Sequence, residues 1–285
     1  MTVATPRCVL SIAGSDSGGG AGIQADLKAF AACGAHGMSA ITAITAQNTA
    51  GVTAVHPIPP EIIIAQVRAV AGDIGVDAVK IGMLGDRTTI EAVAQALDEL
   101  PSGTPVVLDP VMVAESGAQL LDPEAGDTLI ELLLPRATVI TPNLPEARAL
   151  LGDAGEREIE TLARELQALG PAAVVITGGH REEAVDVFFD GERLEELTGP
   201  RHPSNAAHGS GCTHSSVLAA RMAYGDGPLE AAREAKRLAS LAVAQGIHEI
   251  GAGAGPVDIL GIASKAHKTA TSGASRGESA GRVLT

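Results

Sequence analysis

The chain has 285 residues, with 34 acidic and 20 basic side chains, a formal net charge of −14 and only 1% aromatic residues. This acidic balance argues against a nucleic-acid partner or an anionic membrane surface, because phosphate groups require a basic face. No apolar run approaches the roughly 18 residues of a membrane span, and the N-terminal stretch lacks the pattern of a signal peptide. The three cysteines form an odd and sparse set, so we expect a cytoplasmic chain with reduced thiols.

The same charge balance favours a halophilic host. Arginine greatly outnumbers lysine among the basic residues, and the rarity of aromatics requires a core built from Ala, Val, Leu and Ile. An acidic, lysine-poor surface over such a core is expected where salt screens the repulsion between carboxylates. The alternative is an ordinary acidic protein from a GC-rich bacterium.

Short β-branched runs alternate with longer helical patterns along the chain. The first run, residues 8–14, precedes a helix in which Ile23, Leu27 and Phe30 recur at helical spacing. The further expected strands cover residues 38–47, 51–59, 77–83, 105–112, 137–143 and 172–179, followed by a hairpin over 184–197 that turns at Asp190 and Gly191. The further expected helices cover residues 60–74, 86–100 with Asp86 as N-cap, 211–224 and 228–246.

This alternation predicts the fold class α/β, a three-layer α/β/α sandwich around a mostly parallel central sheet. We expect a single domain over residues 1–260. From residue 261 the chain is rich in Ser, Gly and Ala without periodicity, which predicts a disordered tail over 261–285. Ligands of open α/β sheets bind at the carboxyl ends of strands, and these ends are here rich in Gly, Asn, Asp and Gln.

The first strand ends in a glycine-dense loop, Gly14 to Gly22, that is neither a Walker A loop nor a G-x-G-x-x-G motif. It is either a flexible strand–helix turn or a site where the backbone closely approaches a flat ligand. Asp26, one turn into the next helix, could accept hydrogen bonds from an amino or hydroxymethyl group. Gln47 stands at the next strand end, where its amide could pair with an aminopyrimidine edge or simply face solvent.

Carboxylates and an amide follow two later strands. Asp109 comes directly after an apolar strand, and Asn143 and Glu146 form an N-x-x-E arrangement after the next one. Each residue by itself is a common helix cap or turn residue. Together at one sheet edge they favour Mg²⁺, which binds carboxylates and bridges phosphates, and hence phosphoryl transfer.

The stretch HGSGCT leads straight into an apolar-periodic helix. Gly209 and Gly211 allow the free N–H groups of the helix start to converge on an anion, such as a transferring phosphoryl group. At this position Cys212 is expected to have a lowered pKa and to accept the proton of a substrate hydroxyl. The alternatives are an inert small hydrophobe and a zinc site with His208 and His214, which lacks a fourth ligand.

In order, the chain carries the pieces IAGSDSGGGAGIQADLKAF, ITAITAQNTAGV, KIGML, VVLDPVMVAESG, ITPNLPEA, GGH and HGSGCT. From about residue 9 to 259, this set resembles the hydroxymethylpyrimidine/phosphomethylpyrimidine kinases of thiamine biosynthesis, which have the ribokinase-like fold. The resemblance implies an ATP- and Mg²⁺-dependent kinase that phosphorylates 4-amino-5-hydroxymethyl-2-methylpyrimidine and then its monophosphate. It also implies a homodimer.

The resemblance further implies roles for individual residues. The pyrimidine would contact Gly14, Asp26, Gln47, Met83 and Val111. Mg²⁺ would bind to Asp109 and Glu146, and the phosphates to Asn143, Glu146, Thr177 and Ser210. The catalytic anion hole would consist of Gly209, Gly211 and Cys212, with Cys212 where ribokinase relatives carry an aspartate base.

Two positions depart from many relatives, which carry lysine where this chain has Glu115 and Thr177. Both changes remove a cation that could meet a phosphate. The nearest rival interpretation is a pyridoxal or pyridoxine kinase of the same superfamily, since some of these share the Gly-x-Gly-Cys loop. A rival of another class is a non-catalytic ligand-sensing homologue, which would typically have lost the loop's glycines or the acidic residues.

Overall fold

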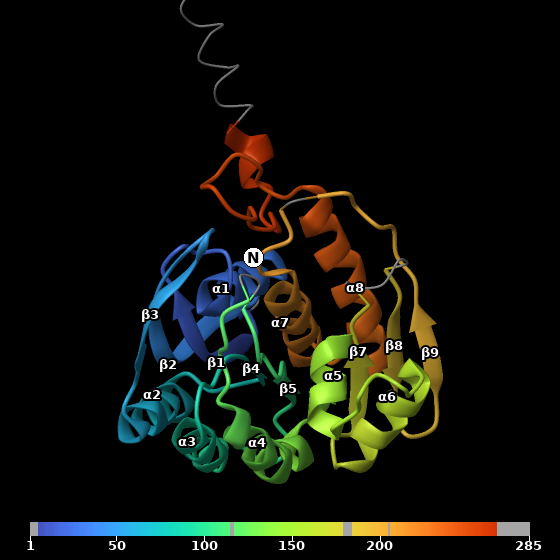
Figure 1. Ribbon diagram of the computed structural model, residues 1–285. Coiled ribbons are helices and arrows are strands. Elements are labelled where there is room, and N and C mark those ends of the chain that lie inside the picture. The colour runs from blue at the N-terminus through green and yellow to red at the C-terminus, as the bar shows by residue number, and fades with distance from the viewer. Residues whose placement is uncertain (1–4, 115–116, 179–183, 205, 267–285) are drawn as a thin grey trace, which may run out of the picture.

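The computed structural model describes residues 5–114, 117–178, 184–204 and 206–266. Within these residues lies a nine-stranded sheet with the strand order β3-β2-β1-β4-β5-β6-β7-β8-β9 (Figure 1). In chain order the strands are β1 (Cys8–Asp16), β2 (His36–Asn48), β3 (Gly51–Pro57), β4 (Ala78–Ile81), β5 (Val106–Leu108), β6 (Val139–Ile140), β7 (Ala173–Ile176), β8 (Asp186–Phe189) and β9 (Leu194–Leu197).

The sheet is mostly parallel, as predicted. All neighbours from β2 to β7 in the strand order run parallel, whereas β3, β8 and β9 at the two edges pair antiparallel. The middle strands β4, β5 and β7 are buried along their whole length; β5 and β7 are accordingly continuous apolar runs, whereas β4 contains the charged Lys80. The β8–β9 hairpin turns at Asp190 and Gly191 as expected, and Asp190 Oδ1 accepts the Arg193 N–H at 2.7 Å.

Helices cover both faces of the sheet (Figure 1). One face carries α1 (Gly22–Ala32), α7 (Ser210–Ala223) and α8 (Pro228–Ala244), and the other carries α2 (Pro60–Asp73), α3 (Arg87–Leu97), α4 (Gly126–Leu132), α5 (Leu144–Leu151) and α6 (Ile159–Ala168). Short 3₁₀ turns, Pro123–Ala125 and Leu134–Arg136, flank α4. Each face has its own core, because β1 directs Val9 to one side and Leu10 and Ile12 to the other. The three-layer sandwich is therefore confirmed.

Helix starts follow the predicted capping chemistry. Asp86 caps α3, and its Oδ1 accepts the Thr89 N–H at 2.7 Å. Pro60 lies in the first turn of α2, where its missing N–H costs no helical hydrogen bond. The start of α7 is Ser210, one residue before the expected boundary.

The predicted disorder after residue 261 is wrong for the first residues of that stretch. Residues 262–266 form a helical turn, and the Asp258 carboxylate accepts the N–H groups of Ile262 and Ala263 at 2.9 Å each. A cap of this kind holds a helical turn even in a sequence without apolar periodicity. Glu115 and residues 267–285 lie outside the described residues. No helix of the described chain has the length and apolar character needed to cross a membrane.

Candidate active site

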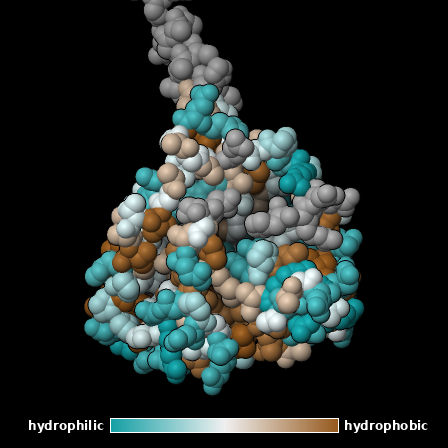
Figure 2. Space-filling model, viewed as in Figure 1, coloured by the Kyte–Doolittle hydropathy of each residue, from teal (hydrophilic) through white to brown (hydrophobic). Residues whose placement is uncertain are grey.

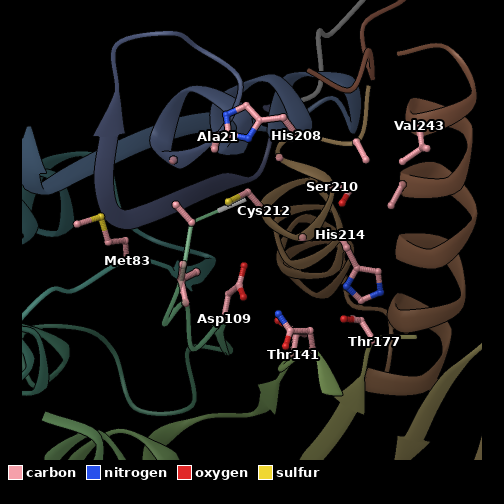
Figure 3. Close-up of a pocket in the computed structure, with 18 of the residues that line it drawn as sticks. Ala21, Met83, Asp109, Thr141, Thr177, His208, Ser210, Cys212, His214 and Val243 are labelled. Atoms are coloured by element: carbon pink, nitrogen blue, oxygen red, sulfur yellow. The ribbon is translucent and has the colours of Figure 1, made fainter. Parts of the chain in front are cut away.

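A cavity of about 420 Å³ opens at the carboxyl edge of the parallel strands. It extends from the loop after β1, past the start of α7, to the space between β7, β8 and α8 (Figure 3). All but one of the predicted site residues line it: Gly14, Gln47, Met83, Asp109, Val111, Asn143, Glu146, Thr177, Gly209, Ser210, Gly211 and Cys212. The structure thus brings strand ends that are far apart in the sequence into one site.

The exception is Asp26, which lies beneath the cavity. Its side chain is fully buried, and its carboxylate accepts hydrogen bonds from Lys80 Nζ at 2.9 and 3.1 Å. The hydroxyls of Ser11 and Ser216 donate to the same carboxylate at 2.6 and 2.8 Å. Asp26 is therefore not among the residues that line the cavity of the ligand-free chain, and its predicted contact with a pyrimidine stays a prediction. Helical spacing located Asp26 in the first turns of α1 but did not show which way that turn faces.

Lys80 is a site residue that the motifs did not single out. It lies within the buried run of β4, is itself fully buried, and lines the cavity. Burial alone would lower the pKa of the amine, but Asp26 first, and then Cys212 and Asp109, raise it above the usual value. The site therefore contains a fixed positive charge close to Cys212 and Asp109.

The glycine-dense loop is tightly bonded, so the interpretation as a flexible turn does not hold. The Asp16 carboxylate accepts the N–H groups of Gly18, Gly20 and Ala21 at 2.8, 2.9 and 2.8 Å. His208 Nε2, from the loop before α7, lies 3.3 Å from the same carboxylate. Burial opposes the charge on Asp16, but the bonds from His208 and the backbone outweigh it and lower its pKa. The loops before α1 and α7 are therefore locked together.

One end of the cavity is a slot lined by Gly14, Gln47, Met83 and Val111. A Cβ at Gly14 would lie 3.0 Å from Met83 Sδ, so the glycine lets this side chain pack closely against the backbone. The side-chain oxygen of Gln47 lies 3.1 Å from Thr45 Oγ1, whose proton is shared with the Ser15 carbonyl at 2.8 Å, so most of the Gln47 amide's hydrogen-bonding capacity is unused. This end therefore offers apolar walls with one amide at the edge.

Asp109 and Glu146 face the cavity near its middle, where they are 6% and 8% exposed. Burial raises the pKa of both groups, and the charge of Asp109 raises that of Glu146 further. The hydroxyl of Thr141, in the same lining, is buried and has no hydrogen-bond partner within the described residues. Two crowded carboxylates beside an unbonded hydroxyl fit a hard divalent cation.

The N-x-x-E arrangement is also a structural device. Asn143 caps α5, and its Oδ1 accepts the Glu146 N–H at 2.9 Å, while Glu146 Oε2 accepts the Asn143 N–H at 2.9 Å. This reciprocal pair is a capping box. The helix-cap interpretation is thus correct, and it leaves the carboxylate of Glu146 in the cavity, where its role toward Mg²⁺ and phosphates stays a prediction.

The start of α7 has the form predicted for an anion hole. Its N-cap, Gly209, has a φ of +81°, and a Cβ there would overlap the carbonyl oxygen of Gly20. Only glycine therefore allows the first turn of α7 to approach the glycine loop so closely. No described side chain caps the N–H groups of this turn, which contains Ser210, Gly211 and Cys212.

The predicted lowering of the Cys212 pKa is wrong. The thiol lies at the cavity but is only partly exposed, and burial raises its pKa to about 12. Lys80 lowers the pKa, whereas Asp26 and Asp109 raise it further. The sulfur also accepts the N–H of Gly22, which holds it against the glycine loop. The thiol of the free protein is therefore protonated at neutral pH.

The other end of the cavity lies between Thr177, β8 and α8. Asp186 Oδ1 accepts hydrogen bonds from Lys236 Nζ at 2.7 Å and from the Gly178 N–H at 2.8 Å. His214, one turn into α7, lies 3.7 Å from the second oxygen of Asp186. Figure 3 shows the imidazole pointing from α7 toward Thr177. We refer to Asp186, His214 and Lys236 as the polar cluster.

The zinc alternative is not supported by this geometry. His208 approaches Asp16, whereas His214 faces Asp186. Over the described ranges, no group of three or more His, Cys, Asp or Glu side chains is arranged to hold a metal ion.

The sequence matches the family model described as phosphomethylpyrimidine kinase over residues 16–258. The chain belongs to the phosphomethylpyrimidine kinase family. A relative from Rhizobium meliloti (strain 1021), named hydroxymethylpyrimidine/phosphomethylpyrimidine kinase, is 51% identical over 254 residues, which cover 87% of this chain and 95% of the relative. The predicted resemblance is confirmed, and the protein is a kinase.

Solved structures from this kinase group confirm the ribokinase-like fold. Phosphomethylpyrimidine kinase from Clostridium difficile 630 is 41% identical, with a TM-score of 0.74, over 83% of this chain and 99% of that chain. Pyridoxal kinase from Bacillus subtilis, solved as an ADP complex, is 39% identical, with a TM-score of 0.82, over 91% of this chain and 99% of that chain. Since both kinds of kinase share the fold, the substrate must be argued from the cavity.

The family motifs contain the glycine loop, the carboxylates and the start of α7. Lys80 is the first residue of the KIGML piece, but the motif assigns it no role, and Asp186 and Lys236 lie outside the motifs, although all three line the same cavity. The sequence contained one sign of these buried charges, which is a charged residue within or beside an apolar run. Lys80 in β4 and Asp186 before Val187 in β8 are examples. That signal marks a buried charge but not the cavity that the charge faces.

Proposed function

We propose that this kinase transfers a phosphate from ATP to the hydroxymethyl group of 4-amino-5-hydroxymethyl-2-methylpyrimidine, and then a second phosphate to the monophosphate. The observation that carries the proposal is one continuous cavity that joins the slot at Gln47 and Met83 to the carboxylates and the start of α7. The name of the Rhizobium meliloti relative supports the substrate, and the ADP in the Bacillus subtilis pyridoxal kinase structure supports a nucleotide donor.

The slot suits a small flat ring. Met83 and Val111 provide apolar contacts for its faces, and the amide of Gln47 offers hydrogen bonds to its amino group or ring nitrogen. Gly14 leaves the space in which the ring and Met83 lie together. A pyrimidine held here directs its hydroxymethyl group toward Cys212 and the start of α7.

Asp109 and Glu146 would hold Mg²⁺, which supplies positive charge to the phosphates when bound. Their mutual repulsion and the unbonded hydroxyl of Thr141 support this assignment. Asn143, Thr177 and Ser210 would contact the phosphates from the same rim. The N–H groups around Gly209, Gly211 and Cys212 would stabilise charge on the transferring phosphoryl group.

Cys212 acts in this proposal as a wall of the anion hole and not as a ready-made base. Its raised pKa leaves little thiolate at neutral pH. Phosphoryl transfer through a loose transition state relies on positioning and charge stabilisation more than on proton removal. The fixed charge of Lys80 close to the thiol adds to that stabilisation.

Product analysis with hydroxymethylpyrimidine and ATP-Mg²⁺ tests the proposal. We expect the monophosphate to appear first and the diphosphate to follow, with one ADP released for each phosphate added. Pyridoxal should be assayed side by side, because it is the substrate of the rival interpretation. Turnover of pyridoxal with no phosphorylation of the pyrimidine would replace the proposed substrate.

We further propose that the kinase is a cytoplasmic homodimer. Exposed apolar side chains lie on β2, β3 and α2 at one sheet edge: Ile44 (49% exposed), Val55 (45%) and Ile62 (49%). Figure 2 shows hydrophobic residues gathered over this edge, and an exposed edge strand offers a pairing surface for a second copy. The three unpaired cysteines agree with a reducing compartment. Light scattering should give twice the chain mass of 28.6 kDa, and Val55→Glu should shift it toward one chain mass.

A further inference from the structure

The polar cluster of Asp186, His214 and Lys236 lines the cavity at the end away from the slot, and the roles proposed above leave it unused. It combines residues from β8, α7 and α8. Asp186, His214 and Lys236 all lie outside the family motifs. Their meeting in one wall is therefore a property that only the fold reveals.

Lys236 and Asp186 form a partly enclosed ion pair. Their side chains are 13% and 3% exposed, and Lys236 Nζ lies 2.7 Å from Asp186 Oδ1. The Gly178 N–H holds the same oxygen at 2.8 Å, so the carboxylate is fixed in place. An ammonium group has three N–H donors, and Asp186 accepts one of them. Among the described residues Lys236 has no further hydrogen-bond partner, which leaves two donors for the cavity that it lines.

His214 supplies an independent observation. Its side chain is 5% exposed, and neither ring nitrogen has a hydrogen-bond partner within the described residues. Burial lowers the pKa of the imidazole, so the ring is neutral, with one donor and one acceptor nitrogen. An unbonded polar group in a buried position carries a free-energy cost. That cost is relieved when a polar ligand enters the adjoining cavity.

The charges of the cavity indicate an anionic ligand at this end. Both lysines among the described lining residues are paired, Lys80 with Asp26 and Lys236 with Asp186, but Lys80 is 0% exposed whereas Lys236 is 13% exposed. His214 lies one turn beyond Ser210, on the helix whose start favours an anion. The space between α7 and Lys236 is thus bordered by donors on both sides.

We propose that Lys236 and His214 bind the phosphate chain of the donor nucleotide, and that Asp186 positions Lys236. This inference rests on the proposed use of ATP. Lys236 provides a charged donor and His214 a neutral N–H donor. Asp186 keeps the Lys236 side chain directed into the cavity between binding events.

Calorimetric titration with ADP, inorganic tripolyphosphate and adenosine tests this assignment. Lys236→Met should weaken the binding of ADP and tripolyphosphate by about 10- to 100-fold, the effect of losing a charged hydrogen bond. His214→Phe should weaken both by about 3- to 10-fold. Adenosine has no phosphate, so its affinity should change by less than about threefold in either variant. Binding of the pyrimidine at the distant slot should also be unchanged.

Arg233→Met is the matched control. Arg233 is on the same helix and forms an ion pair with Glu195 at 2.7 Å, but its side chain is 51% exposed. Its replacement should leave all three affinities unchanged. Since Lys236→Met leaves a buried carboxylate without its partner, Asp186→Asn/Lys236→Met provides a second variant in which both charges are removed together. It should show the same selective loss for ADP and tripolyphosphate.

The assignment would be overturned if Lys236→Met and Asp186→Asn/Lys236→Met both bound ADP and tripolyphosphate as tightly as the wild type. It would also be overturned if both variants lost as much affinity for adenosine as for ADP. Unchanged ADP affinity in His214→Phe would remove His214 from the phosphate contacts. Product analysis separates this inference from the proposed substrate. If ADP binding depends on Lys236 but the pyrimidine is not phosphorylated, the substrate proposal fails and the nucleotide assignment stands.

Discussion

Two buried lysine–aspartate pairs border the cavity, and they differ in how completely their polar groups are bonded. Lys80 and Asp26 are both 0% exposed, and two serine hydroxyls complete the shell of Asp26. Lys236 and Asp186 are 13% and 3% exposed, and the neighbouring His214 has no hydrogen-bond partner within the described chain. A fully bonded network specifies the fold, whereas a network with unused groups beside a cavity is suited to a ligand.

The largest expected effect comes from breaking the Lys80–Asp26 pair, in which the carboxylate is fully bonded. Asp26→Asn removes the carboxylate that is bonded to the buried Lys80 ammonium, and should lower the free energy of unfolding by about 3–5 kcal/mol. Urea denaturation followed by circular dichroism measures this loss. Asp186→Asn is the control, and should cost less because Lys236 can move its charge toward the cavity. Equal losses in the two variants would show that the pairs do not differ in the way proposed.

The next effect concerns the open slot at the opposite end. Gln47→Ala removes an amide that the proposal places on the pyrimidine, and should raise KM for the pyrimidine by about 10- to 100-fold. The value of kcat should change little if the ring still reaches the start of α7. Gln95→Ala is a suitable control, because Gln95 lies on the exposed side of α3. An unchanged KM in Gln47→Ala would remove Gln47 from the substrate site.

Much of this architecture follows from local sequence pattern. Strand–helix alternation gave the layers, and Asp86 marked a helix start because an N-cap is a local interaction. The strand-end motifs gave most of the cavity lining, since parallel strands bring their carboxyl ends to one edge. These inferences depend on the spacing of residues within about one helical turn or one strand, and this spacing can be seen directly in the sequence.

The remaining features depend on contacts between distant segments. The bonding of Asp26 beneath the cavity could not be predicted, because its partners Lys80 and Ser216 lie 54 and 190 residues away. The acidity of Cys212 was misjudged for the same reason, because burial outweighs the charge of the helix start. The pairing of Asp186 with Lys236, 50 residues apart, has no local signature. A single sequence displays none of these distances.

Replacement of the Cys212 thiol, which lies close to the Lys80–Asp26 pair, should have a smaller effect, and this effect is on the rate. Cys212→Ala should lower kcat by about tenfold, the value of one hydrogen-bonding group, because the backbone donors of α7 remain. Steady-state kinetics with saturating pyrimidine and ATP-Mg²⁺ measures it. A loss of about 10²–10⁴-fold would indicate instead that the thiol serves as the base once the site is filled.

The same thiol should also react slowly with alkylating reagents near neutral pH. Because its pKa is raised to about 12, the thiolate fraction should rise about tenfold for each pH unit from pH 7 to 9.5, with no plateau. Mass spectrometry of a Cys8→Ser/Cys33→Ser variant treated with iodoacetamide measures the rate at Cys212 alone. A plateau below pH 9 would contradict the raised pKa.

The smallest expected effect comes from salt, and it separates the exposed charges from the buried pairs. The 34 acidic side chains outnumber the 20 basic ones, so the folded surface repels itself at low ionic strength. The Debye length falls from about 30 Å at 0.01 M salt to about 3 Å at 1 M, so molar KCl should raise Tm by roughly a few degrees.

The Lys80–Asp26 pair has no contact with the ionic atmosphere, because both side chains are 0% exposed. The penalty of Asp26→Asn should therefore be the same in low and high KCl, while the wild-type and variant Tm values rise in parallel. The exposed Arg68–Glu99 pair, with side chains 62% and 32% exposed, is the contrast. Any stabilisation it gives should vanish in molar KCl, as Glu99→Gln would show. A wild-type Tm that does not respond to KCl would remove the prediction of a halophilic surface, and it would leave the kinase assignment untouched because that assignment depends on the cavity.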